Sequence, residues 1–308
     1  MAADSKKFRI VGVLLMAAGV LGCLTATMQA QQPQDYSKVE TKTTQVADGI
    51  YVLTAVGGNI GVCAGNDGIL LVDSQYAPMH QKIMEALAKI SNKPIRFLID
   101  THFHGDHTDG NALMAKEGAV IVAHETIRAR LSTPGTAPNS PPILKESLPV
   151  VTYNDNITLH FNGEDVYIFH PKPAHTDGDS VVYFRKANVM HVGDLTFFQG
   201  FAPVNIPGGF TIDGIIAAME EILKVANPDT KFISGHRGPI MSVKDLEQQR
   251  AMTMVIRDRI LSGIRAGKTV EEVVASKPTA EFDENEKMGR PAEEFVSSVY
   301  QDLSRSAR

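Results

Sequence analysis

The stretch that decides the fold is IRFLIDTHFHGDH, residues 95–107, in which an apolar run leads directly into three histidines and an aspartate. The apolar run predicts a buried strand. In extended backbone, residues two apart point the same way, so His102 and His104 aim at one point beyond the strand end. Asp106 and His107 follow a glycine that permits a tight turn. Four ligand-type side chains within six residues predict a metal site rather than a polar surface loop.

Three more ligand-type residues stand at equivalent places further along the chain. His175 lies in PKPAHTDGDSVVYF, Asp194 in NVMHVGDLTF and His236 in KFISGHRGP. Each is at or just beyond a predicted strand and beside glycine or proline. Loops at strand ends are where sheets present chemistry, so these three residues join the candidate metal site.

The rest of the first half reads as short strands followed by helices. Three β-branched runs punctuated by glycine and aspartate predict an antiparallel meander. Apolar residues at three- and four-residue spacing then predict a helix, and another short helix and a strand follow residue 107. A stretch rich in proline, serine, threonine and glycine predicts a dividing loop. In chain order these are strands 49–56, 59–65 and 68–74, helix 77–90, a short helix from Asn111, strand 119–124 and loop 131–143.

The second half repeats this order of strands and helices. Strands are expected at 165–171, 180–185, 188–194 and 231–236, with a helix at 211–226 and two helical patterns closing the chain. This approximate duplication predicts two sheets packed face to face, with helices outside.

The combined motif resembles the metallo-β-lactamase superfamily of hydrolases. Its parts are HxHxDH, a later His-Thr, an isolated Gly-Asp and a terminal Gly-His, and the resemblance covers roughly residues 46–265. The segment GILLVDS, which reaches Asp73, matches the family's early strand. The resemblance implies an α/β (α+β) fold, a four-layer αβ/βα sandwich with a dinuclear metal site in the cleft between the sheets.

The resemblance also implies a role for each candidate ligand. Two Zn²⁺ ions are expected, although the ligand types do not exclude iron. A metal-bound hydroxide would attack the substrate, and Asp106 would orient it as the catalytic carboxylate. The first ion would be held by His102, His104 and His175, the second by Asp106, His107 and His236, and both by a bridging Asp194.

The remaining histidines and Cys63 are expected outside the metal site. Cys63 lies within a strand and reads as a small buried hydrophobe, because no base is evident near it. Two of the histidines, His124 and His191, are candidates for holding the ligands in position. Structural or exposed positions are predicted for His80, His124, His160, His170 and His191.

The sequence has features of more than one subgroup of this superfamily, so it does not determine the substrate. The surroundings of His175 are similar to those in exported metallo-β-lactamases, which favours β-lactam-like substrates. Asp194 stands where true β-lactamases carry cysteine or serine, as in glyoxalase II-type thioesterases and lactonases, which are the alternative. Phe197 replaces a lysine that grips the antibiotic's carboxylate in one large group, and Lys172 is an alternative anion contact. A more remote alternative is an iron-dependent redox member of the same fold.

The start of the chain resembles a secretory signal. Residues 1–30 place basic residues before a long uncharged apolar run, which predicts a signal peptide or N-terminal anchor and a periplasmic or secreted bacterial protein. Cys23, in VLGC, leaves a lipoprotein open. Residues 31–308 are expected to form a single hydrolase domain with C-terminal helices from about residue 265.

Composition limits the classes of partner. The chain has 308 residues, 43% hydrophobic and 21% charged, which is typical of a globular protein. Its formal net charge of −5 argues against a nucleic-acid-binding surface. The expected partner is a small-molecule substrate, and membrane contact is expected only through an N-terminal lipid or uncleaved anchor.

Overall fold

The first half of the chain forms a mixed sheet of seven strands. The computed structural model describes residues 34–133, 144–196, 201, 204–236, 238, 240–282 and 291–306. The sheet runs in the order β1 to β7, antiparallel from β1 to β4 and parallel from β4 to β7. Its strands are β1 Lys42–Ala47, β2 Ile50–Thr54, β3 Ile60–Gly65, β4 Gly68–Val72, β5 Ile95–Ile99, β6 Val120–His124 and β7 Val151–Tyr153.

A second sheet of five strands follows, in the order β12-β11-β10-β9-β8. Its pairs are antiparallel except for β11 and β12, which are parallel. The strands are β8 Asn156–Phe161, β9 Glu164–Phe169, β10 Val181–Phe184, β11 Val189–His191 and β12 Lys231–Ile233.

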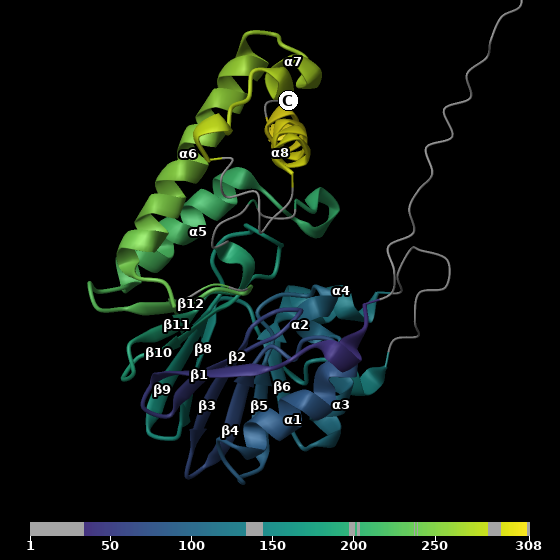
Figure 1. Ribbon diagram of the computed structural model, residues 1–308, viewed down its shortest axis with the longest axis vertical. Helices are drawn as coiled ribbons and strands as arrows, with labels where there is room; N and C mark the ends of the chain where they lie inside the picture. The colour runs from purple at the N-terminus through teal and green to yellow at the C-terminus, as the bar shows by residue number, and fades with distance from the viewer. Residues whose placement is uncertain are drawn as a thin grey trace, which may run out of the picture. The chain divides into compact units, whose positions relative to one another are not determined.

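Helices lie outside the two sheets (Figure 1). The α-helices are α1 His80–Ala88, α2 Gly105–Thr108, α3 Asn111–Lys116, α4 Glu125–Ser132, α5 Ile212–Val225, α6 Val243–Arg265, α7 Val270–Ala275 and α8 Ala292–Ser306. Short 3-10 turns occur at Tyr36–Lys38, Ala77–Met79, Lys145–Ser147, Gly193–Leu195 and Ile206–Gly208. None of the helices in the described ranges combines the length and the apolar character needed to cross a membrane.

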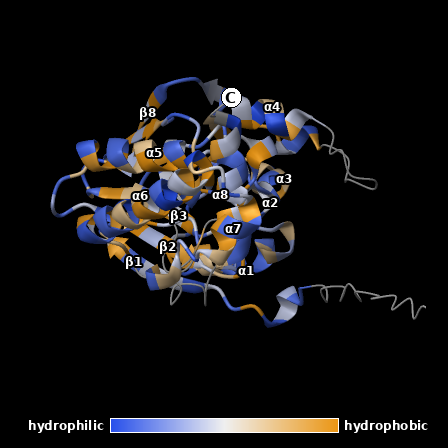
Figure 2. Cartoon of the chain, turned by 90° about the horizontal axis from the view of Figure 1, so that it is seen from above, coloured by the Kyte–Doolittle hydropathy of each residue, from blue (hydrophilic) through white to orange (hydrophobic). Residues whose placement is uncertain are grey.

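Three apolar cores separate four layers. Alternation along β4 sends Leu70 and Val72 into the core between the sheets, and Ile69 and Leu71 into the core beneath α1. The third core joins the five-stranded sheet to α5, α6 and α8. In Figure 2 both α5 and α6 carry hydrophobic and hydrophilic residues, as helices with one buried face do. The predicted four-layer αβ/βα sandwich is therefore confirmed.

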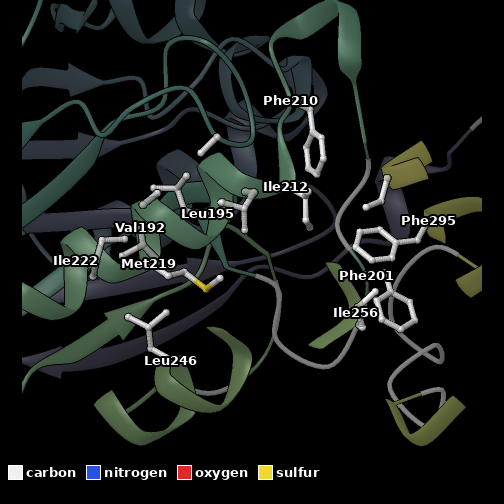
Figure 3. Close-up of a cluster of buried hydrophobic side chains, with 14 of the residues drawn as sticks. Val192, Leu195, Phe201, Phe210, Ile212, Met219, Ile222, Leu246, Ile256 and Phe295 are labelled. Atoms are coloured by element: carbon white, nitrogen blue, oxygen red, sulfur yellow. The ribbon is translucent and has the colours of Figure 1, made fainter. Parts of the chain in front are cut away.

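Aromatic side chains tie the third core to the segment that follows β11. Phe201 stacks on Phe295 of α8 with ring centroids 4.9 Å apart, and Phe210 and Ile212 are buried beside them (Figure 3). Asp302 of α8 accepts a hydrogen bond from the backbone N–H of Ile212 at 2.8 Å, at the start of α5. The C-terminal helix thus holds Phe201 and the start of α5 in place.

Most predicted elements are present, and the differences have physical causes. The antiparallel meander is confirmed, and the predicted helices and strands occur in the predicted order; α4 and β7 were not predicted. The sequence did not indicate β1, because this edge strand is largely exposed and polar. The predicted loop 131–143 starts too early, because α4 continues to Ser132; residues 134–143 lie outside the described residues, as does the predicted signal at 1–30.

Candidate metal centre

The seven predicted ligands lie in the loops and short elements that connect the strands. His102 and His104 come directly after β5, and α2 carries Asp106 and His107. The other three enter from the second half of the chain: His175 precedes β10, Asp194 lies in the turn after β11, and His236 follows β12. The structure brings them together as two neighbouring groups.

Three imidazoles converge in the first group. His104 Nδ1 lies 3.0 Å from His102 Nε2 and 3.0 Å from His175 Nε2. His102 and His175 are buried, with 1% and 0% of their surface exposed. Three ring nitrogens therefore lie close to one another. The acidic member of this group is Asp194.

The second group combines two imidazoles and a carboxylate. His236 Nε2 lies 3.2 Å from His107 Nε2 and 3.1 Å from Asp106 Oδ2. His107 is fully buried, whereas the side chains of His236 and Asp106 are 26% and 24% exposed. This group therefore forms the solvent-facing side of the centre.

Asp194 lies between the two groups. Its Oδ2 is 3.8 Å from His102 Nε2, 3.5 Å from His175 Nε2 and 3.3 Å from His236 Nε2. Its Oδ1 is 3.4 Å from His107 Nε2. One carboxylate thus faces both groups at once.

The donor set fits a bound metal. A neutral imidazole has one N–H, so three converging ring nitrogens cannot all be satisfied by one another, whereas a cation accepts all three lone pairs. Imidazole and carboxylate ligands without a thiolate suit zinc and iron alike. The cluster is therefore a metal-binding site by the chemistry of its donors.

A family model described as the metallo-beta-lactamase superfamily matches residues 53–236, which include all seven ligands. The chain belongs to this superfamily. Among curated relatives, the alpha subunit of 2,4-dinitroanisole O-demethylase from Nocardioides sp. (strain JS1661) is 28% identical over 157 residues, covering 49% of this chain and 43% of that protein. The chain spans less than half the length of the curated relatives it matches.

Solved structures of the metallo-β-lactamase superfamily share the fold. A metallo-β-lactamase from Pontibacter korlensis has a TM-score of 0.60 at 17% identity, covering 70% of this chain and 99% of that one. The inverting sec-alkylsulfatase from Pseudomonas sp. has a TM-score of 0.67 at 17% identity. The match covers 85% of this chain and 50% of the sulfatase chain. At these identities the likeness extends to the fold alone.

Burial and neighbouring charges shift the pKa values of the side chains in this site. Burial alone raises the pKa of Asp194, yet His236 and His107 hold that pKa well below its usual value. Burial alone lowers the pKa of His236, but Asp194 and Asp106 outweigh it and raise the pKa to about 9. Burial dominates at His175 and lowers its pKa to about 3. The carboxylates are ionised and available as ligands.

Asp73 contacts His107 of the second group on the side of the ring away from the other ligands. The sequence analysis did not predict this contact. It follows β4 with a positive φ of 68° and is completely buried. Its Oδ2 lies 2.7 Å from His107 Nδ1, and its two oxygens accept hydrogen bonds from the backbone N–H and hydroxyl of Thr101. A buried carboxylate at a strand end was the available signal, because such a group needs partners.

Gly235 makes room for the bridging carboxylate. A Cβ at this position would lie 2.0 Å from Asp194 Oδ1 and 2.6 Å from the carbonyl carbon of Gly193. The backbone N–H of Gly235 also donates to the carbonyl of Gly193 at 2.7 Å. The glycine before His236 is therefore required by the close approach of two turns.

The other histidines lie outside the two metal groups, as expected. His191 is buried, with Nε2 3.0 Å from the carbonyl of Asn59, and its Nδ1 accepts from Gly193 N–H beside Asp194. His124 instead caps α4 and stacks on His170, with ring centroids 3.9 Å apart. The remaining two pair with acids near the surface, His80 with Glu117 and His160 with Asp165.

Of the residues considered for other roles, Cys63 is buried and free of disulfides, and burial raises the pKa of its thiol to about 11. Lys172 is exposed. Phe197 lies outside the described residues.

Proposed function

We propose that this chain is a metal-dependent hydrolase that uses two zinc ions. The observation that carries the proposal is the position of Asp194, whose carboxylate lies within 3.8 Å of ring nitrogens in both groups. A carboxylate shared in this way suits two ions held close together, as in two-metal hydrolytic sites.

Each group supplies three side chains besides the shared carboxylate. His102, His104 and His175 would hold one ion, and Asp106, His107 and His236 would hold the other. When bound, zinc ions lower the pKa of water and polarise the bond to be cleaved.

The protein's own contribution is position and charge. Buried His102 and His175 keep the first group rigid, while Asp73 fixes the ring of His107 through its Nδ1. Asp106 is partly exposed and ionised, because the hydrogen bond with His236 and the charge of His107 outweigh burial and keep its pKa low. It can therefore accept a hydrogen bond from the attacking water and orient it.

For the substrate we propose amide- or ester-type bonds, with strained cyclic amides such as β-lactams first and lactones or thioesters as the rival class. The sequence around His175 supports the first class, and Asp194 supports the second. The relatives broaden the range of bonds to be tested, since one is named for O-demethylation and others for alkyl sulfates.

A side-by-side assay of the zinc-loaded protein tests this proposal. The substrates are a chromogenic cephalosporin, an acyl-homoserine lactone, S-lactoylglutathione and an alkyl sulfate, each with and without a chelator. Chelator-sensitive hydrolysis of at least one substrate is expected, and its absence for all four would count against a hydrolase. A kcat/KM for another substrate far above that for the cephalosporin would reverse the proposed order.

Phe197→Lys adds a check on the β-lactam assignment. If a missing cation weakens cephalosporin binding, the added lysine should lower KM roughly tenfold or more, because a charge-assisted contact contributes ~1.5–3 kcal/mol. An unchanged KM would argue that a missing cation is not the reason for weak cephalosporin binding.

We also propose export of the protein from the cytoplasm. The support is the basic start and uncharged run within residues 1–30. Mass spectrometry of the mature N-terminus tests it: a start near Gln31 indicates soluble export and a lipidated Cys23 a lipoprotein. An intact Met1 in the cytosol contradicts both.

A further inference from the structure

Asn205 is a neighbour of the metal centre that the sequence did not mark. It lies between the turn that carries Asp194 and helix α5, and its Nδ2 is 3.3 Å from Nε2 of His104. The opposite ring nitrogen, Nδ1, faces His102 and His175 at 3.0 Å each. The two nitrogens of His104 therefore have separate surroundings: one faces the metal group and the other faces the amide of Asn205.

The chemistry of imidazole links these two surroundings. When one ring nitrogen gives its lone pair to a cation, the single proton of the neutral ring resides on the other nitrogen. If His104 binds a metal through Nδ1, its Nε2–H needs a hydrogen-bond acceptor. Asn205 supplies one, because a half-turn of its amide exchanges Nδ2 for Oδ1.

The half-turn affects one other hydrogen bond of the Asn205 side chain. Oδ1 of Asn205 accepts a hydrogen bond from the backbone N–H of Gly208 at 3.1 Å. That same N–H also donates to the backbone carbonyl of Asn205 at 2.9 Å. After the amide turns, the N–H of Gly208 keeps its backbone partner but loses Oδ1 and faces Nδ2, a second donor; the acceptor gained by the Nε2–H of His104 offsets this loss.

The segment that carries Asn205 is itself held in place. The carbonyl of Gly208 accepts a hydrogen bond from the backbone N–H of Asp177 at 3.1 Å. The carboxylate of Asp177 lies 2.5 Å from Nη2 and 3.3 Å from Nε of Arg130, on α4. The guanidinium of Arg130 lies over the ring of Phe103, the residue before His104. A series of contacts through Gly208, Asp177 and Arg130 thus links the segment of Asn205 to Phe103, next to His104.

We propose that Asn205 is a positioning residue for the first metal group, its amide oxygen accepting the Nε2–H of His104 and so selecting the tautomer that binds through Nδ1. This inference rests on the proposed zinc site. Partners of this kind on the far side of a ligating histidine typically change metal affinity ~10–100-fold.

Zinc affinity of three variants tests the proposal, measured by competition with a chromophoric chelator. Asn205→Ala should weaken one of the two zinc-binding steps ~10–100-fold and leave the other unchanged, and Asn205→Asp, which keeps an acceptor, should recover most of that loss. Asn66→Ala is the matched control, since Asn66 is exposed in the turn between β3 and β4. Equal affinity for Asn205→Ala and the unmodified chain would overturn the proposal.

Histidine-ring NMR gives a readout that does not depend on the alanine variant folding. In the zinc-loaded protein, His104 should carry a slowly exchanging proton on Nε2 with a close contact to the side chain of Asn205. A proton on Nδ1 instead, or no contact with Asn205, contradicts the proposal.

These outcomes separate the two proposals. If the unmodified chain binds no zinc, the zinc hydrolase and the role of Asn205 are both wrong. If it binds two zinc ions and hydrolyses a substrate but Asn205→Ala behaves as the unmodified chain does, only the role of Asn205 is wrong.

Discussion

Asp73 Oδ2 lies 2.7 Å from Nδ1 of His107, although the two residues follow different strands of the same sheet. Both side chains are completely buried. The carboxylate directs Nε2 of His107 toward Asp194 and His236, so the orientation of a ligand in the second group is determined by a residue outside it.

Asp73→Asn is expected to lower zinc affinity of the second group ~10–100-fold while the fold persists. Asparagine tolerates the positive φ at this position, so the backbone should not change. Zinc titration of the apo-protein measures the effect. Asp67→Asn, in the exposed turn between β3 and β4, serves as control, and equal affinity losses in both variants would argue against a specific role for Asp73.

Gly235→Ala is expected to disrupt the metal centre more than the sheets. The added methyl group would overlap Asp194 Oδ1, so the bridging carboxylate must move. We expect a loss of ~1–3 kcal/mol in the free energy of unfolding, together with loss of bound zinc. Urea unfolding and elemental analysis check both. Gly105→Ala is the control, since its Cβ would meet no atom within 4 Å, and full zinc occupancy in Gly235→Ala would contradict the expectation.

Loss of one ligand should empty one group before the other. His102→Ala should reduce bound zinc from about two ions to about one, and His236→Ala should weaken the second ion, because an incomplete ligand set binds poorly. Elemental analysis after dialysis measures this, with exposed His160→Ala as control. Stoichiometric iron in place of zinc would favour the redox alternative over hydrolysis.

Asp106→Asn is expected to reduce kcat ~100-fold or more while changing the free energy of unfolding by less than ~1 kcal/mol. The side chain is a quarter exposed and lies outside the three cores, so its charge acts on the reaction rather than on packing. Steady-state kinetics beside circular dichroism measure both. Parallel loss of fold and activity would show that Asp106 is a structural carboxylate.

Cys63 is expected to resist alkylation in the native protein. Burial raises the pKa of its thiol to about 11, so the thiol keeps its proton as the pH passes its ordinary pKa and forms the reactive thiolate only near pH 11. In a Cys23→Ser background, iodoacetamide at pH 8 should react ~100-fold or more slowly with the native chain than with the unfolded chain. Equal rates would mean that Cys63 is accessible.

The structure brings the residues predicted as ligands together, and all of them except His175 come directly after a strand or on the short element that follows it. Alternation after β5 aims His102 and His104 at one point, and the same strand-end rule selects Asp194 and His236. All these residues lie in the two groups that the structure brings together. Local sequence was sufficient here because chemistry at a sheet edge leaves a local pattern of polar residues after apolar ones.

The pairing of the supporting residues with the ligands could not be predicted in this way. Asp73 contacts His107 and Asn205 contacts His104 only through packing of distant segments. Strand β1 was missed because an exposed edge strand has no apolar alternation to detect. Helix α4 was also missed, because Ile127 is its one buried residue and it has no apolar face to detect. Contacts between distant segments, and elements without a buried face, leave little trace in local sequence.

The seven ligands are divided between the two halves of the chain, and this division has a consequence for biosynthesis. A ribosome completes residues 102–107 long before Asp194 and His236 emerge. An early segment with three imidazoles and no bridging carboxylate forms only part of each group. The seven residues can come together only after the second sheet has been made and packed, so we expect the proposed site to bind metal only after translation has passed β12. Which metal the site acquires would then depend on when the site forms as well as on its affinity for each metal.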